Sequence, residues 1–195
     1  MRRAYLLITL AAIALIIGAC SQQQAGPSYD DALAVAEDAN KAIEGLNWKV
    51  YAERVHPDEL ERFRQMVLPD LERLETEEKP DSVTLFDRTF SLETWRTGPA
   101  DKFFTDILWT IFNISPELKR SFSKMENNCI GAVAENDTTV HVVVHTEMRI
   151  GMQYVEEMNV TTLRKFENEW RVLLSTKIEG VAMMLKQSVG MQQKP

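Results

Sequence analysis

The spacing of hydrophobic residues changes once along the chain. Between residues 28 and 122, apolar positions recur every three or four residues, which is the period of a helix facing a core. After Lys124 they alternate with polar positions, which is the period of a strand. Helices followed by strands that short turns connect are typical of an α+β fold. We therefore expect N-terminal helices that cover one face of a curved antiparallel sheet.

The first three predicted helices are bounded by prolines, a glycine and a capping signature. Ser28 begins the first helix and Gly45 ends it. A short second helix runs to His56, and Pro57 opens a third. Pro69 has no amide hydrogen to donate, so we expect the third helix to kink or restart there before it ends near residue 74.

A charged loop is predicted over residues 75–82, and Pro99 begins the most apolar helix of the chain. A short helical turn restarts at Pro116 and ends near residue 122. The alternating part then predicts four strands with polar turns at 135–137 and 167–169. The strands span residues 129–134, 139–150, 153–166 and 170–177.

The N-terminus has the pattern of a secretory signal peptide. Two arginines precede an apolar run over residues 4–17, and small residues precede Cys20. The segment Ile17-Gly18-Ala19-Cys20 resembles the bacterial lipobox. That resemblance implies cleavage between Ala19 and Cys20 and acylation of the Cys20 sulfur, which then anchors the chain in a lipid bilayer. An uncleaved membrane span is the alternative, because the apolar run approaches the lower limit of about 17 residues.

The residue after the cysteine bears on the location. In the Gram-negative sorting rule that the lipobox resemblance implies, Ser21 permits transfer to the outer membrane. We therefore expect a lipid-anchored protein of the bacterial cell envelope, in the outer membrane and facing the periplasm.

The charge and the cysteine content argue against a nucleic-acid partner and against an intramolecular disulfide. Cleavage removes two arginines and no acidic residue, so the formal net charge changes from −7 to −9. Nucleic-acid binding depends on clustered lysines and arginines, which the chain lacks, so we expect no nucleic-acid partner. With Cys20 acylated, Cys129 has no partner for an intramolecular disulfide, and we expect it to behave as a small buried apolar side chain.

Two segments resemble the nuclear transport factor 2-like superfamily. The first is Leu46-Asn47-Trp48-Lys49-Val50-Tyr51-Ala52-Glu53-Arg54-Val55-His56-Pro57, and the second is the closing hairpin over residues 163–174. The resemblance implies a cone-shaped roll, a strongly curved sheet wrapped over helices, with an apolar cavity at its open end and frequent dimerisation through the outer sheet face. The superfamily includes ketosteroid isomerases, polyketide cyclases, dehydratases and many noncatalytic modules, so the fold does not choose the function.

These interpretations divide the chain into four parts. They are a signal peptide (1–19), a lipidated cysteine with its tether (20–27), a nuclear transport factor 2-like domain (28–187) and a polar tail (188–195).

Four residues are candidates for lining a cavity: Trp48, Tyr51, His56 and Tyr154. Each also has a plain structural interpretation, in which the aromatic residues belong to the core and His56 caps a helix before Pro57. We assign no catalytic residue and expect no cofactor.

His141 and His145 do not predict a metal site as a pair. In a strand they point the same way but lie roughly 13 Å apart, which is too far to share one ion. Their face alternates with the apolar face that holds Val140, Val142 and Val144, so we expect the histidines on the outer face of the sheet. Solvent, a second copy of the chain or a partner protein could cover that face.

The sequence therefore favours a noncatalytic binding or scaffolding module. Its partner would be a small apolar ligand, a second copy in a homodimer or another envelope protein. The alternative is an isomerase or dehydratase for a small apolar substrate, with His56 as base and Tyr51 or Tyr154 as hydrogen-bond donor. A homodimeric structural component without a ligand is the third hypothesis.

Overall fold

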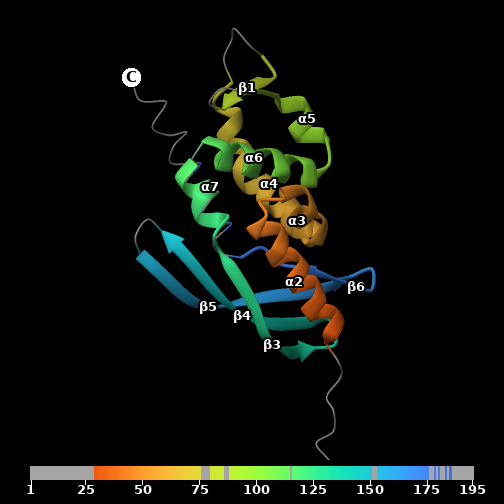
Figure 1. Ribbon diagram of the computed structural model, residues 1–195. Helices are drawn as coiled ribbons and strands as arrows, with labels where there is room; N and C mark the ends of the chain where they lie inside the picture. The colour runs from red at the N-terminus through yellow and green to blue at the C-terminus, as the bar shows by residue number, and fades with distance from the viewer. Residues whose placement is uncertain are drawn as a thin grey trace, which may run out of the picture.

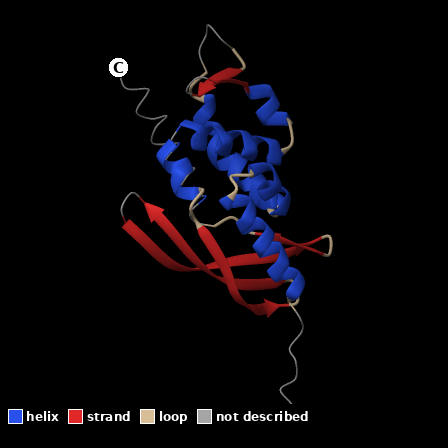
Figure 2. Ribbon diagram, viewed as in Figure 1, coloured by secondary structure: helices blue, strands red, loops and turns tan. Residues whose placement is uncertain are grey.

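The computed structural model describes residues 29–75, 80–85, 88–114, 116–150, 153–175, 178, 180, 183 and 185. Helices form one layer and a curved antiparallel sheet forms the other, so the α+β prediction is confirmed (Figures 1 and 2). A small hairpin lies at the end of the helical layer that is farthest from the sheet (Figure 2). The predicted signal peptide, its cleavage site at Ala19 and Cys20, the tether and the polar tail lie outside the described residues.

The chain order is helices, a hairpin, further helices and then four strands. The helices are α2 (Asp30–Glu44), α3 (Trp48–Arg54), α4 (Pro57–Glu72), α5 (Leu92–Thr97), α6 (Ala100–Ile114) and α7 (Pro116–Phe122). The strands are β1 (Ser82–Leu85), β2 (Arg88–Ser91), β3 (Glu126–Asn136), β4 (Thr139–Ile150), β5 (Gln153–Phe166) and β6 (Glu169–Val172). No helix in the described part of the chain combines the length and the apolar character that a membrane crossing needs.

The predicted break at Pro69 is wrong, because α4 continues through it. Pro69 is exposed, so water can bind the Gln65 carbonyl that lost its helical donor. Two residues later, Leu71 is fully buried and holds the end of the helix against the core.

The main sheet has the order β3-β4-β5-β6, and every neighbouring pair is antiparallel. The bounds of β4 and β5 agree with the prediction, whereas β3 is longer than predicted at both ends. β6 ends at Val172, and residues 173–175 are not strand, so the predicted continuation there is wrong. The remaining two predicted positions, 176 and 177, lie outside the described residues.

β3 is irregular at two places. Its register against β4 shifts between Cys129 and Gly131 and again between Ala134 and Asn136. Each shift adds one residue to β3 that has no partner on β4, which is the pattern of a β-bulge. Bulges bend a strand and increase its twist, so they contribute to the curvature of the sheet.

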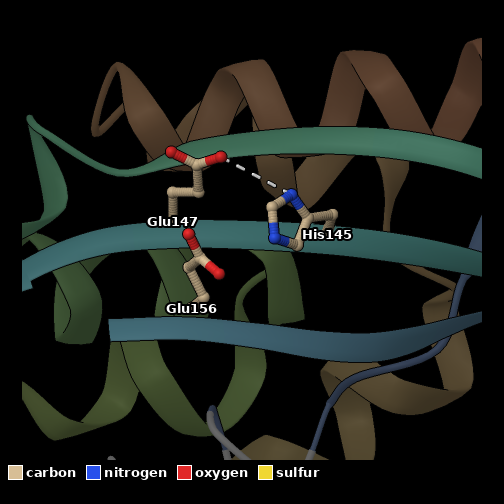
Figure 3. A group of neighbouring side chains, drawn as sticks. All are labelled: His145, Glu147 and Glu156. Carbon is tan, nitrogen blue, oxygen red and sulfur yellow. Dashed lines mark ion pairs between the residues drawn. The ribbon is translucent and has the colours of Figure 1, made fainter. Parts of the chain in front are cut away.

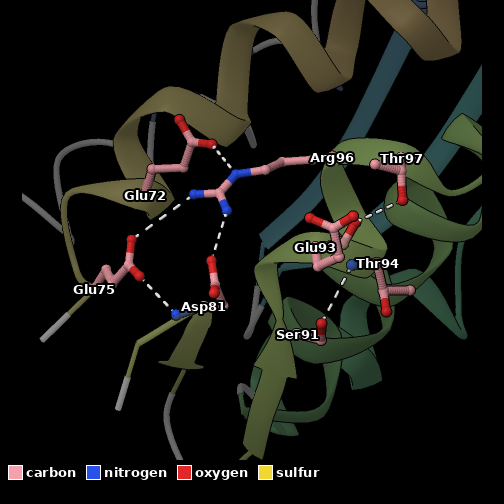
Figure 4. A network of polar contacts seen from close by, with 8 residues as sticks. All are labelled: Glu72, Glu75, Asp81, Ser91, Glu93, Thr94, Arg96 and Thr97. Carbon is pink, nitrogen blue, oxygen red and sulfur yellow. Dashed lines mark hydrogen bonds and ion pairs between the residues drawn. The ribbon is translucent and has the colours of Figure 1, made fainter. Parts of the chain in front are cut away.

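The β1–β2 hairpin and α5 were not predicted from the sequence. An arginine ties this region to the rest of the molecule (Figure 4). Arg96 on α5 pairs with Glu72 at 2.7 Å, with Asp81 at 3.0 Å and with Glu75 at 3.8 Å. The end of α4, the start of β1 and α5 therefore meet at one guanidinium group. Ser91 caps α5 by accepting a hydrogen bond from the Thr94 amide at 3.2 Å.

Aromatic residues fill the helical layer. Phe103 and Phe104 on α6 are buried and flank Phe63 on α4, with ring centroids 6.1 and 5.0 Å away. Trp95 of α5 meets the Phe103 ring edge to face at 5.3 Å. Full burial of one such side chain stabilises a fold by roughly 1.5–3 kcal/mol. This apolar packing places α6 at the centre of the helical layer, as its sequence predicts.

The faces of β4 alternate as predicted. Val140, Val142 and Val144 are buried against the helices, while His141 and His145 are only partly covered on the other face. We call the first the inner face and the second the outer face.

Candidate ligand-binding cavity

A cavity of about 580 Å³ lies between the inner face of the sheet and the helices. Its lining comes from α2, α3, α4, α6, α7, the strands β3 to β6 and the segment that follows β6. Most of the lining side chains are apolar. They include Ala39, Ile43, Phe112, Phe122, Met125, Val144, Met148, Val172, Leu174 and Ile178.

A row of hydrogen-bonded polar side chains crosses one wall of the cavity. Asn159 donates through Nδ2 to the Thr146 hydroxyl at 3.1 Å, and that hydroxyl donates to Asn127 Oδ1 at 2.7 Å. Asn127 then donates from its backbone nitrogen and from its side-chain Nδ2 to Glu44 Oε1, at 2.8 and 3.0 Å. We call these four residues the polar row. It joins β5, β4, β3 and α2, so it fixes the helix over the sheet at the cavity.

Tyr51 of α3 lines the cavity and is buried. Burial raises the pKa of its phenol, so the hydroxyl stays neutral and remains a donor across the physiological pH range. Within the described part of the chain, its hydroxyl forms no hydrogen bond. Because Tyr51 lines the cavity, its hydroxyl can donate to an acceptor atom on a ligand, and such a hydrogen bond contributes about 0.5–1.5 kcal/mol net.

Cys129 is half-buried, and Asn40 of α2 points its Nδ2 at the Cys129 sulfur at 3.6 Å. Burial raises the pKa of the thiol, with the carboxylate of Glu37 adding to the effect. The thiol is therefore neutral near pH 7 and a poor nucleophile.

Glu59 and Arg62 on α4 bring charge to the lining of the cavity. Arg62 Nη2 lies 2.5 Å from Glu59 Oε2, and the Arg62 side chain is 46% exposed, so we place the pair at the rim.

His56 caps α4. Its Nδ1 accepts a hydrogen bond from the Asp58 amide at 3.2 Å, and its ring meets Phe166 edge to face at 5.4 Å. Its backbone amide donates to the Val172 carbonyl at 2.9 Å, which joins the α3–α4 junction to β6. Burial lowers the pKa of His56, and the nearby Arg164 guanidinium lowers it further.

The four predicted cavity residues do not gather at one point. Tyr51 lines the cavity, whereas Trp48 packs behind it on Phe112, with ring centroids 4.5 Å apart. His56 is buried at the helix cap just described. Tyr154 is 60% exposed, and its hydroxyl donates to Glu147 on the outer face.

The polar row was not predicted from the sequence. A signal for it exists, because Thr146 interrupts the otherwise apolar inner face of β4 between Val144 and Met148. Asn127 and Asn159 become its partners only through the strand register, which the sequence alone does not supply.

No protein-family model matches the chain, and no curated protein matches its sequence. Among solved structures, the chain is similar to an NTF-2-like protein of unknown function from Shewanella oneidensis MR-1, with 10% sequence identity and a TM-score of 0.41. The similarity covers 73% of this chain and 92% of that one. At this level the likeness carries no argument about function.

Proposed function

We propose that this protein is a lipid-anchored protein of a bacterial envelope that binds a small, mainly apolar ligand in its cavity without transforming it. The cavity is the observation that supports ligand binding. Its volume of about 580 Å³ falls in the range of roughly 300–1,000 Å³ that is common for small-molecule sites. Apolar walls with a few fixed polar groups are also typical of such sites.

The polar groups indicate what kind of ligand fits. The Tyr51 hydroxyl is a neutral donor with no described partner, while the polar row already satisfies many of its own groups. A ligand with an apolar body and one acceptor oxygen, such as a ketone, an ester or an acid, would pair with Tyr51 and leave the row intact.

Displacement of a fluorescent apolar probe tests this directly. The full chain should bind N-phenyl-1-naphthylamine, and a medium-chain methyl ketone should displace it. Tyr51→Phe should weaken ketone binding by roughly 2–10-fold, the equivalent of one hydrogen bond of about 0.5–1.5 kcal/mol. Tyr154→Phe is the matched control on the outer face and should leave the ketone affinity unchanged. Equal affinity in all three proteins would contradict the role of Tyr51, and failure to bind the probe would contradict the binding function.

The positions of the candidate catalytic residues favour binding over isomerisation. His56 uses Nδ1 as a helix cap, and Tyr154 lies on the outer face, so the proposed base and this donor are not opposed across the cavity. His56→Asn retains a capping acceptor. It should keep the ligand affinity of the wild type, whereas an isomerase with His56 as base would lose turnover.

The anchor is a separate part of the proposal and has its own test. We expect protein extracted from membranes to carry acyl chains on Cys20, with the chain beginning there and Ser21 directing it to the outer membrane. Intact-mass analysis of the membrane fraction should show the added lipid. An unmodified Cys20, or a processed and membrane-bound Cys20→Ala variant, would refute it.

A second candidate function is a scaffold that assembles through the outer face. Five large apolar side chains there or at the neighbouring strand edges are more than half exposed. They are Ile130, Val133, Tyr154, Met158 and Val160. Exposed apolar patches commonly mark interaction sites. Sedimentation analysis should then show a dimer that Val160→Lys dissociates, whereas a monomeric wild type at micromolar concentration would reject this assembly.

A further inference from the structure

Three side chains that could bind a metal ion, one histidine and two glutamates, lie together on the outer face (Figure 3). His145 and Glu147 are two residues apart on β4 and therefore point to the same side of the sheet. Glu156 on β5 is the register partner of Glu147. One nitrogen or oxygen from each of the three side chains lies within 4.8 Å of the others, and His145 Nδ1 is 3.6 Å from Glu147 Oε1.

The donor set has the chemistry of a transition-metal site. Imidazole nitrogen and carboxylate oxygen bind Zn²⁺ at about 2.0–2.2 Å, which places the donor atoms of a tetrahedral site about 3.3 Å apart. The donor atoms lie within 4.8 Å of one another, so they need to close by at most about 1.5 Å. His145 and Glu147 are partly buried and held by the central strand, while the exposed Glu156 can turn toward them.

The surrounding charges favour a cation. Glu126, Glu147 and Glu156 stand in one row across β3, β4 and β5, each the register partner of the next. Like charges directly opposite one another destabilise a sheet. Lys124 and Arg149 lie beside Glu126 and Glu147 around a small hollow and offset part of this charge. A bound divalent ion would offset the negative charge of Glu147 and Glu156 beside His145.

Tyr154 orients one of the three side chains. Its hydroxyl donates to Glu147 Oε2, which leaves Oε1 directed at His145. Hydrogen bonds of this kind to a metal-binding carboxylate are typical of metal sites, where they fix the geometry of the donor.

We propose that His145, Glu147 and Glu156 bind one divalent transition-metal ion, with Zn²⁺ as the fitting case. Three protein donors leave a fourth position for water or for a group from a partner molecule. The site uses His145 without His141, so the separation of the two histidines along the strand does not oppose it.

His141 provides the matched comparison. It lies on the same strand and the same face, and its Nε2 is 3.1 Å from Glu135 Oε2. Its Nδ1 lies 3.0 Å from the Thr162 hydroxyl, so Thr162 stands where a second carboxylate would be needed. Among the described residues, no metal-binding group includes His141.

Zn²⁺ titration of the full chain tests the site, with calorimetry for affinity and NMR for location. The chain has three histidines, so each ring signal can be assigned by substitution. Zn²⁺ should bind once per chain and shift the ring signals of His145, with little change at His56 and His141. Binding should be lost in His145→Ala, fall at least about tenfold in Glu156→Gln and stay unchanged in His141→Ala.

Tyr154→Phe should weaken Zn²⁺ binding about 10–100-fold while it keeps the fold, because it removes only the orienting hydroxyl. Circular dichroism of each variant separates loss of the site from loss of folding. Absence of saturable Zn²⁺ binding, undiminished binding in His145→Ala, or shifts at His141 instead of His145 would overturn the proposal.

Discussion

The ring of His56 closes the first turn of α4, and protonation removes that contact. Nδ1 can accept from the Asp58 amide only while it carries no proton, and a positive ring would stand at the positive end of the helix dipole. Burial and Arg164 lower the pKa of His56 below its ordinary value of 6.5. The folded state therefore favours the neutral ring more strongly than the unfolded chain does.

The pH dependence of stability follows with a definite sign. The contribution of the neutral ring to the free energy of unfolding is fully present above pH 6.5. It is lost as the pH falls from there through the lower folded pKa. Urea unfolding at about pH 7.5 and about pH 5 should show a smaller drop for His56→Asn than for the wild type, because asparagine caps the helix without titrating. An equally steep drop in His56→Asn would contradict the assignment.

At the scale of elements, the junction between α5 and α6 depends on the absence of a side chain at Gly98. A β-carbon there would lie 2.4 Å from the Thr94 carbonyl oxygen, and this oxygen accepts the Gly98 amide hydrogen bond at 2.9 Å. The Gly98 carbonyl in turn accepts from Arg64 of α4 at 2.5 Å. A methyl group at this position must therefore displace the last turn of α5 or the Gly98 backbone, which also holds the hydrogen bond to α4.

Gly98→Ala should destabilise the fold by about 1–3 kcal/mol, the usual effect of forcing extra volume into a packed site. Gly131→Ala in β3 is the control, since no atom lies within 4 Å of the β-carbon that it would add. We expect its effect to stay within about 0.5 kcal/mol. Thermal or urea unfolding of both variants measures the difference, and similar stabilities would show that the α5–α6 junction relaxes around the methyl group.

The strands differ in how well the sequence predicted them. β4 and β5 are long and alternate regularly, so their bounds followed from the pattern alone. β1 and β2 have only four residues each, which is too few for a period to stand out. The predicted end of β6 was too late because Leu173 and Leu174 continue an apolar run although the ladder stops at Val172. The hydrophobic pattern indicates which residues are buried, whereas the end of a strand depends on which backbone groups find hydrogen-bond partners.

The candidate cavity was less predictable than the sheet. Tyr51 could be chosen because it is an aromatic residue in the segment that carries the family resemblance. The polar row depends on four separate elements and on two register shifts in β3, so no local spacing encodes it.

At the scale of the whole molecule, a ligand in the cavity should stabilise the entire fold. The lining joins nearly every helix to every strand of the main sheet, so unfolding must empty the site. At a ligand concentration 100 times its Kd, the free energy of unfolding should rise by about 2.7 kcal/mol. Differential scanning fluorimetry with the methyl ketone should show an increase in Tm at saturation that follows its Kd. A Tm that does not respond to saturating ketone would show that binding occurs elsewhere or in the unfolded chain as well.

Because of the two bulges of β3, the shape of the cavity depends on the number of residues in this strand as well as on their types. Cys129 pairs with Val144 and Gly131 pairs with Val143, so deleting Ile130 would leave both pairings and the facing of their side chains intact. The ladder would become regular and the strand straighter, since the extra residue is what bends it. We therefore expect single-residue deletions at Ile130 or Glu135 to yield folded proteins whose binding preferences differ. Related chains could then change their ligand by losing or gaining one residue at the edge of the sheet, with no substitution in the cavity wall.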